Sequence, residues 1–275
     1  MKSHWHRLCL PLLFVLTVAA TAQTKAPAKP ANTSSANSKV MDQARHAYYS
    51  LRGVGLDEFQ STIKPNWEVV LKDELKANPE GGQAALKMLN GLHFAMLLDK
   101  AGKVTVTHRA DVEPVNAQQR EGFNQIFSGM EQAVSGFFAT WSLFMLNSPF
   151  PEAGVDYQLD DLGSQWRLSY KDGTGDVVTL MSKDLVISEV KVTTPEFVSS
   201  VRPTFNRTGI GFVLTGYAAD YKPTSGPGVV KLDVKIDHQK IEGAQLPVSL
   251  IADSVLDGAP THIELGFSEY QVKSH

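Results

Sequence analysis

The chain has 275 residues, of which 43% are hydrophobic and 20% charged, as in an ordinary globular protein. Its net charge of −3 excludes the strongly basic surface that is typical of nucleic-acid-binding proteins, and no long run of Lys or Arg indicates a polybasic membrane patch. The length allows one large domain or two small ones, each with a substantial core.

The first 22 residues predict an export signal. Basic residues between Lys2 and Arg7 precede an apolar run from Leu8 to Ala20, and Ala20-Thr21-Ala22 supplies a small-residue cleavage site. The apolar run is shorter than the roughly 20 residues of a membrane-spanning helix. An uncleaved N-terminal anchor is the alternative, against which Pro11 and the cleavage site argue. We therefore expect a periplasmic or secreted protein that is not an integral membrane protein after cleavage.

The single cysteine, Cys9, lies inside the predicted signal. The mature chain would then contain no cysteine at all. This excludes disulfides, thiolate metal sites and cysteine nucleophiles from the mature protein.

Residues 23–38 are rich in Pro, Ala, Ser, Thr and Asn and contain almost no large apolar side chain. Such a stretch cannot bury enough surface to offset its ordering entropy, which predicts a disordered linker. Folding should begin near Val40, and we predict a single α+β domain over residues 39–275.

The first half of this domain shows mainly helical patterns. Apolar residues from Val40 to Leu51 recur at helical spacing until Gly53 and Gly55 end the pattern, and alternation over residues 59–63 predicts a short strand. Two further helices are predicted over residues 66–77 and 82–89. The segments HFAMLLD and KVTVTHR, joined by a turn at KAGK, predict a hairpin over residues 93–109.

The longest helical pattern runs from about Asn116 to Leu146. Large apolar side chains follow one another at intervals of four and three residues, which places them along one stripe of a helix about 45 Å long. Part of this stripe could line a cavity for an apolar ligand, with these candidate residues: Phe123, Phe127, Met130, Phe137, Trp141 and Phe144. The alternative is that the stripe fills the concave side of a sheet as ordinary core.

From about Tyr157 to Val272 the pattern changes to strand-like runs separated by turn residues. In one run, apolar residues from Val230 to Ile236 alternate with charged residues from Lys231 to Asp237, as in a sheet with one buried and one wet face. Helices followed by a strand meander predict an α+β fold, with a curved, half-barrel-like antiparallel sheet that packs on or wraps helices, including the long apolar one.

The last third of the chain resembles the LolA-like periplasmic lipoprotein carriers and their outer-membrane lipoprotein-sorting relatives. The resemblance is carried by KIEGAQLP at residues 240–247, the turn Asp257-Gly258 and the closing strand GFSEYQV at residues 266–272. It implies an incomplete antiparallel barrel that wraps helices around an apolar cavity for acyl chains. Two features depart from the family: the helical region over residues 66–146 looks inserted, and no arginine matches the carriers' functional arginine. No functional residue is therefore carried over.

No catalytic, metal-binding or cofactor-binding constellation is recognisable. Removal of His4 and His6 with the signal leaves six of the eight histidines, and none has metal-ligand spacing. His93 and His108 could face each other across the predicted hairpin. Asp172 and Asp176 flank a Gly-rich segment that predicts a hairpin loop rather than a calcium site.

We therefore expect a periplasmic, non-enzymatic binding protein for a lipid, a lipoprotein acyl chain or another apolar ligand. The main alternative is a cell-envelope interaction module with a dry core, whose partner is another protein bound at an exposed sheet edge. A third possibility is a hydrolase whose site is assembled from residues far apart in the sequence. No cofactor and no nucleic-acid partner are expected.

Overall fold

The computed structural model describes residues 35–152 and 154–274, so the predicted signal peptide of residues 1–22 lies outside the described part. The described residues group into two compact units. The first comprises residues 55–142 and 265–274, and the second comprises residues 35–54 and 143–264 without residue 153. Each unit is built from segments that are far apart in the sequence.

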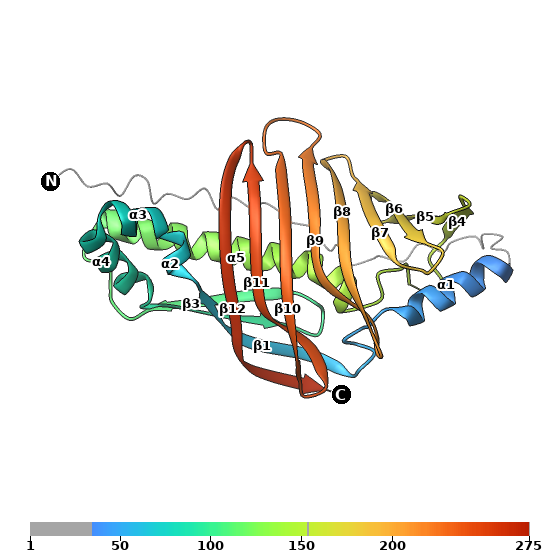
Figure 1. The fold of residues 1–275 in the computed structure, drawn as a ribbon, viewed down its shortest axis with the longest axis horizontal. Coiled ribbons are helices and arrows are strands. Elements are labelled where there is room, and N and C mark those ends of the chain that lie inside the picture. Colours follow the sequence, from blue (N-terminus) through green and yellow to red (C-terminus); the bar gives the residue numbers. More distant parts are fainter. Residues whose placement is uncertain (1–34, 153, 275) are drawn as a thin grey trace. The chain divides into compact units, whose positions relative to one another are not determined.

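The elements follow one another along the chain as labelled in Figure 1. The first unit contains β1 (Leu56–Pro65), α2 (Trp67–Val70), α3 (Lys72–Ala77), α4 (Pro79–Leu89), β2 (Leu92–Leu98), β3 (Val104–Ala110), most of α5 (Ala117–Met145) and the end of β12 (Ala259–Ser274). The second unit contains α1 (Ser35–Ala47), β4 (Tyr157–Asp161), β5 (Gln165–Asp172), β6 (Gly175–Ser182), β7 (Ile187–Thr193), β8 (Phe197–Thr208), β9 (Gly211–Pro223), β10 (Val230–Ile241), β11 (Ala244–Leu256) and the start of β12.

The strands form one antiparallel sheet of twelve strands in the order β3-β2-β1-β12-β11-β10-β9-β8-β7-β6-β5-β4. Neighbours along the chain are mostly neighbours in the sheet, and β12 closes the chain by pairing with β1. β3 and β4 are the two ends, so the sheet is curved but unclosed. The predicted α+β class with a half-barrel-like antiparallel sheet is confirmed.

Alternation of side chains along the strands follows the predicted pattern. On β10, Val230, Val234 and Ile236 are buried, whereas Lys231 and the other charged residues between them are exposed. On β2, every second residue from Leu92 to Leu98 is buried. Because side chains of a strand point alternately to its two faces, one face of these strands forms core and the other remains in contact with water.

The long helix is confirmed nearly at its predicted bounds. α5 has 29 residues, so its axis is about 44 Å long. Its start is capped by Asn116, whose side-chain oxygen accepts a hydrogen bond of 2.8 Å from the backbone N–H of Gln119. No helix within the described residues combines the length and the hydropathy needed to cross a membrane.

The helices before α5 differ from prediction in their boundaries. The helix predicted over residues 66–77 is divided at Leu71 into α2 and α3. The helix predicted to begin at Gly82 begins instead at Pro79, because Asn78 accepts a hydrogen bond of 3.1 Å from the Gly81 N–H and proline is favoured at the first helical position. The Asn78-Pro79 start is visible in the sequence, but the apolar spacing that predicted this helix begins only after it.

α1 also begins earlier than expected. It starts at Ser35, so the last four residues of the predicted linker of residues 23–38 are helical rather than disordered. It ends at Ala47, before the expected end at Leu51, because the chain then runs beside β9. The Tyr49 N–H donates to the Phe212 carbonyl at 3.1 Å. Gly211 makes this approach possible, since a Cβ there would lie 2.8 Å from the Tyr49 nitrogen.

Candidate ligand-binding core and surface groove

The six residues predicted to line an apolar cavity fall into both units. Five of them, from Phe123 to Trp141, belong to the first unit, whereas Phe144 belongs to the second. All are buried except Phe127, which is half-buried. In the first unit they form two ring clusters along α5, with the buried Met130 between them in the helix.

The cluster at the C-terminal part of the stripe is a packed aromatic core. Trp141 and Phe138 have ring centroids 5.4 Å apart, and both lie against Phe59 of β1, at 6.2 and 6.0 Å. Phe267 of β12 contacts Phe137 at 6.1 Å and Phe138 at 5.6 Å. Aromatic pairs of this geometry contribute about 0.5–1.5 kcal/mol each beyond their buried area. These rings contact one another and the strands, so a ligand could reach them only if they moved apart.

A bulge in β12 shapes this core. Gln60 pairs with Gln271 but Thr62 pairs with Ser268, so β12 has an additional residue here, and Glu269 adopts a φ of +55°. The bulge places the Tyr270 ring 5.8 Å from that of Phe59. Burial raises the pKa of the Tyr270 hydroxyl far above its usual value, so this side chain is neutral.

The other cluster surrounds Phe127 and is less enclosed. The Phe127 ring stacks on the His108 ring of β3, with centroids 3.9 Å apart and planes 17° apart. It also lies 5.9 Å from Phe94 of β2 and 6.0 Å from Phe123. Phe94 in turn contacts Trp67 of α2 at 6.4 Å. In this cluster the Phe127 ring is therefore partly exposed, whereas the rings of Phe94, Phe123 and Trp67 are buried.

The helical segment α2–α4 borders this end. Trp67 and Leu71 are buried in it, and its last turn contacts α5 where Gln119 donates a hydrogen bond of 3.1 Å to the Met88 sulfur. α3 and α4 lie close together at Gly82, where a Cβ would come within 2.9 Å of the Leu75 Cα. The segment thus packs as a small helical layer beside Phe127.

In the second unit, Phe144 joins a separate aromatic group. Its ring lies 5.8 Å from Phe205, and Phe205 lies 5.1 Å from Tyr48. The Tyr48 hydroxyl donates to the Leu185 carbonyl at 2.9 Å and accepts from the Ile187 N–H at 2.7 Å. Burial raises the pKa of Tyr48 far above its usual value, so the hydroxyl stays protonated. It therefore acts as a fixed structural contact between the end of α1 and the sheet.

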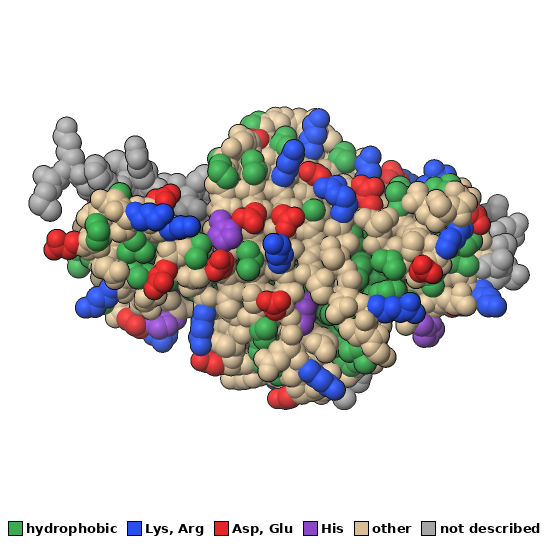
Figure 2. Space-filling model, in the orientation of Figure 1, with side chains coloured by type: hydrophobic (Ala, Val, Ile, Leu, Met, Phe, Trp, Pro, Cys, Tyr) green, Lys and Arg blue, Asp and Glu red, His purple; other side chains and the backbone are tan. Residues whose placement is uncertain are grey.

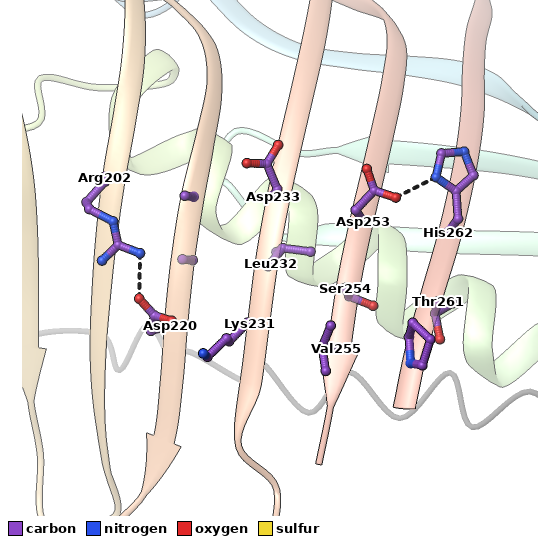
Figure 3. A pocket seen from close by; sticks show the side chains of 13 residues that line it. Arg202, Asp220, Lys231, Leu232, Asp233, Asp253, Ser254, Val255, Thr261 and His262 are labelled. Carbon is purple, nitrogen blue, oxygen red and sulfur yellow. Dashed lines mark hydrogen bonds and ion pairs between the residues drawn. The ribbon is translucent and has the colours of Figure 1, made fainter. Parts of the chain in front are cut away.

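A groove of about 730 Å³ lies on strands β8–β12 of the second unit (Figure 3). Arg202 and Asp220 form an ion pair at one end. At the other, the His262 ring nitrogens lie 2.6 Å from Asp253 and 3.2 Å from Glu264, and these hydrogen bonds raise the pKa of His262. Between them, Asp233 is directly opposite Asp253 across the strand pair.

The groove has mixed charges and no recognisable reaction chemistry. Figure 2 shows acidic and basic side chains interspersed over strands β8–β11 rather than gathered by sign. Within the described residues, no group of three or more His, Asp, Glu or Cys side chains is arranged to hold a metal ion. No sequence pattern predicts this groove, because its residues come from five strands and alternate along each strand like ordinary surface residues.

The other sequence candidates have structural roles. The segment around Asp172 and Asp176 is the β5–β6 hairpin, as predicted, and Asp176 forms an ion pair with Lys171 at 2.9 Å. His93 and His108 do not face each other. The β2–β3 register places His93 opposite Arg109 and His108 opposite Phe94, which puts the two histidines on opposite faces.

Comparison with known proteins adds no relative. The chain matches no protein-family model, and neither a curated protein nor a solved structure is significantly similar to it.

Proposed function

We propose that this protein is a non-enzymatic binding protein that takes up an apolar chain, such as the acyl chain of a lipid or a lipoprotein, in the first unit. The half-buried ring of Phe127 carries the proposal. It marks the place where the aromatic surface of α5 is incompletely covered by β2 and β3. An apolar chain that replaced the missing cover would contact the exposed part of the Phe127 ring, and would reach the buried rings of Phe94 and Phe123 if the surrounding side chains moved apart.

The composition of this region supports the proposal. Binding sites for apolar ligands are lined mainly by hydrophobic and aromatic side chains with a few polar groups. Here His108 is the polar group stacked on the Phe127 ring, Gln119 lies one turn before Phe123 on α5, and Met96 of β2 and Met130 of α5 are buried. Methionine side chains are flexible and adapt to irregular shapes, so they favour rearrangement around an inserted chain.

The proposed location is the periplasm or the extracellular space. It rests on the basic residues, the apolar run and the cleavage site of residues 1–22, which lie outside the described residues. The resemblance to LolA-like carriers points to the same compartment. Expression of the full-length chain, followed by cell fractionation and N-terminal sequencing, tests the location and the cleavage site. We expect a mature protein that begins at Gln23.

The binding test is native mass spectrometry of the protein purified without detergent from the periplasm, followed by titration with a fluorescent fatty acid. We expect a bound species of lipid mass and saturable probe binding. Phe127→Ala should weaken probe binding about five- to tenfold, as loss of one aromatic contact predicts. Phe197→Ala is the matched control, because Phe197 is also half-buried but contacts Tyr221 in the second unit. A ligand-free mass together with no probe binding would rule the proposal out.

A second candidate function is a cell-envelope interaction module, and it is favoured by the outer edge of β3, with which no described strand pairs. An edge strand presents unpaired N–H and C=O groups to which another strand can add. If the protein binds a partner protein equally well when no lipid is bound to it, that result would favour this candidate over the first.

A further inference from the structure

The outer edge of β3 is regular, and no strand of the described residues pairs with it. The Asp99 N–H donates to the Lys103 carbonyl at 3.0 Å, and the Asp111 N–H donates to the Gly91 carbonyl at 2.9 Å, so the odd-numbered residues of this strand bond to β2. In an antiparallel ladder the alternate residues bond to the other side. The backbone groups of the following residues therefore point outward: Val104, Val106, His108 and Ala110. Among the described residues, none of these four has a backbone hydrogen bond to another segment.

The opposite end of the sheet is protected. β4 has only five residues and ends in Asp160-Asp161, and both carboxylates form ion pairs, with Arg167 and Lys183. Its outward Leu159 carbonyl accepts a hydrogen bond of 3.1 Å from the Asn37 side chain of α1. Short strands, charges and covering segments are the usual protection of an edge. β3 has seven residues paired with β2 without a bulge, and its first four are the β-branched Val104–Thr107.

We propose that a second copy of this chain binds the β3 edge, so that two β3 strands pair antiparallel around a twofold axis at Thr107. In this register Val104 pairs with Ala110 of the other copy and Val106 with His108. All four outward-pointing residues of each strand are then hydrogen-bonded. The proposal does not rest on the binding of an apolar ligand.

Charge selects this register. Lys103 and Asp111 flank the strand at equal distances from Thr107, so each lysine lies opposite the aspartate of the other copy. A twofold axis at Val106 would also align outward backbone groups, but it would place Lys103 opposite Arg109 and leave Ala110 unpaired. Opposite charges across a strand pair stabilise it, and like charges destabilise it.

The aspartate is already held in place for this contact. Arg109 donates a hydrogen bond of 2.7 Å to Asp111, and the His93 ring lies 2.8 Å from the same carboxylate oxygen. These contacts lower the pKa of Asp111, so it is ionised at neutral pH. Side chains at positions 103, 105, 107, 109 and 111 share one face of the strand, and Lys103 of the second copy would meet the carboxylate there.

Disulfide formation tests the register. Thr107 would face its own copy in a non-hydrogen-bonded pair with Cα atoms about 4.5 Å apart, within disulfide range. In a Cys9→Ser background, which removes the chain's only cysteine, Thr107→Cys should form a covalent dimer under mild oxidation. Thr105→Cys is the matched control on the same strand and face, because the two copies of residue 105 would lie about 14 Å apart.

Sedimentation velocity over a concentration series tests the association itself. The full-length protein, purified after export, should show a concentration-dependent dimer. Lys103→Glu should raise the dimer dissociation constant about tenfold, since two attractive contacts become repulsive, and Lys103→Glu combined with Asp111→Lys should restore it. Val106→Pro should leave a monomer, because it removes an outward N–H and no bond to β2.

The outcomes separate cleanly. A covalent dimer from Thr107→Cys but not from Thr105→Cys, with rescue by the charge reversal, establishes this interface. A monomer at every concentration overturns it. Equal cross-linking of the two cysteine variants, or a dimer unaffected by Lys103→Glu, means that any association uses another surface. None of these readouts depends on bound lipid, so failure here leaves the proposed function untouched.

Discussion

Phe127 on α5 and His108 on β3 stack face to face, with ring centroids 3.9 Å apart. The contact joins the long helix to the end strand of the sheet, at the point where the aromatic stripe is only half-buried. The other five residues of the stripe are buried, and Trp141 has no exposed surface. Phe127 is therefore the accessible position of a stripe whose other residues are buried.

This difference in burial predicts different costs of truncation. Trp141→Ala removes a fully buried ring that contacts Phe59 and Phe138, and should lower the free energy of unfolding by about 3–5 kcal/mol. Phe127→Ala should cost about 1–2 kcal/mol, because part of that ring is already exposed to water. Leu143→Ala, two residues beyond Trp141 on the same helix but 44% exposed, should change stability by less than about 0.5 kcal/mol. Urea denaturation measures all three, and equal losses for Trp141 and Leu143 would contradict the packing.

The close approach of α1 to β9 predicts a sharp difference between two neighbouring glycines. Gly211 has a φ of +113°, and an added Cβ would lie 2.8 Å from the Tyr49 nitrogen and 2.9 Å from the Ala47 carbonyl oxygen. Gly211→Ala should therefore cost about 2 kcal/mol or more. Gly209→Ala is the control, because nothing lies within 4 Å of a Cβ at that position. Thermal unfolding of the two variants should separate them by several degrees, and similar midpoints would contradict this account.

The buried hydroxyl of Tyr48 predicts a specific loss on its removal. It accepts from the Ile187 N–H at 2.7 Å, in a buried environment. Tyr48→Phe keeps the ring contacts with Phe205 and Phe212 but leaves this N–H without a partner, so it should cost about 1–3 kcal/mol. Hydrogen exchange at the Ile187 amide should accelerate by more than global destabilisation alone explains. An unchanged exchange rate of the Ile187 amide would show that the Tyr48 hydroxyl does not stabilise this N–H.

His238 predicts acid sensitivity. Its burial lowers the pKa in the folded protein to about 4, below the ordinary histidine value of about 6.5 in an unfolded chain. Between these values the unfolded chain binds more protons than the folded one. The contribution of His238 is therefore present above about pH 6.5 and lost as the pH falls towards 4. Urea denaturation of the wild type and of His238→Asn across this range should show a shallower fall for the variant, and parallel curves would contradict the assignment.

His262 should act in the opposite direction, which makes it a useful comparison. Hydrogen bonds to Asp253 and Glu264 raise its folded-state pKa, so its stabilisation is present at low pH and lost as the pH rises through that value. The ring is 39% exposed, and solvent screening therefore makes the effect small. A titration of the His262 ring by NMR is the direct measurement, and a midpoint below that of an unfolded peptide would contradict the two hydrogen bonds.

Local patterns determined much of this protein from sequence alone. The intervals of four and three between Phe123 and Phe144 predicted α5 to within one residue at either end, because an amphipathic stripe follows the helical repeat whatever surrounds it. The β2–β3 hairpin and the alternation on β10 were read correctly for the same reason. The predicted export signal, the apolar ligand and the LolA-like resemblance remain predictions.

Only the tertiary structure decided what those patterns face. It placed five of the six candidate ligand-lining residues in one unit and Phe144 in the other, and it ended α1 at Ala47 because Tyr49 bonds to Phe212. It also left the outer edge of β3 without a partner strand among the described residues, whereas Asn37 bonds to Leu159 of β4 from 122 residues away in the sequence. The period of a segment is set by its own backbone geometry, but strand order, register and edge exposure depend on contacts between distant segments, which no local pattern encodes.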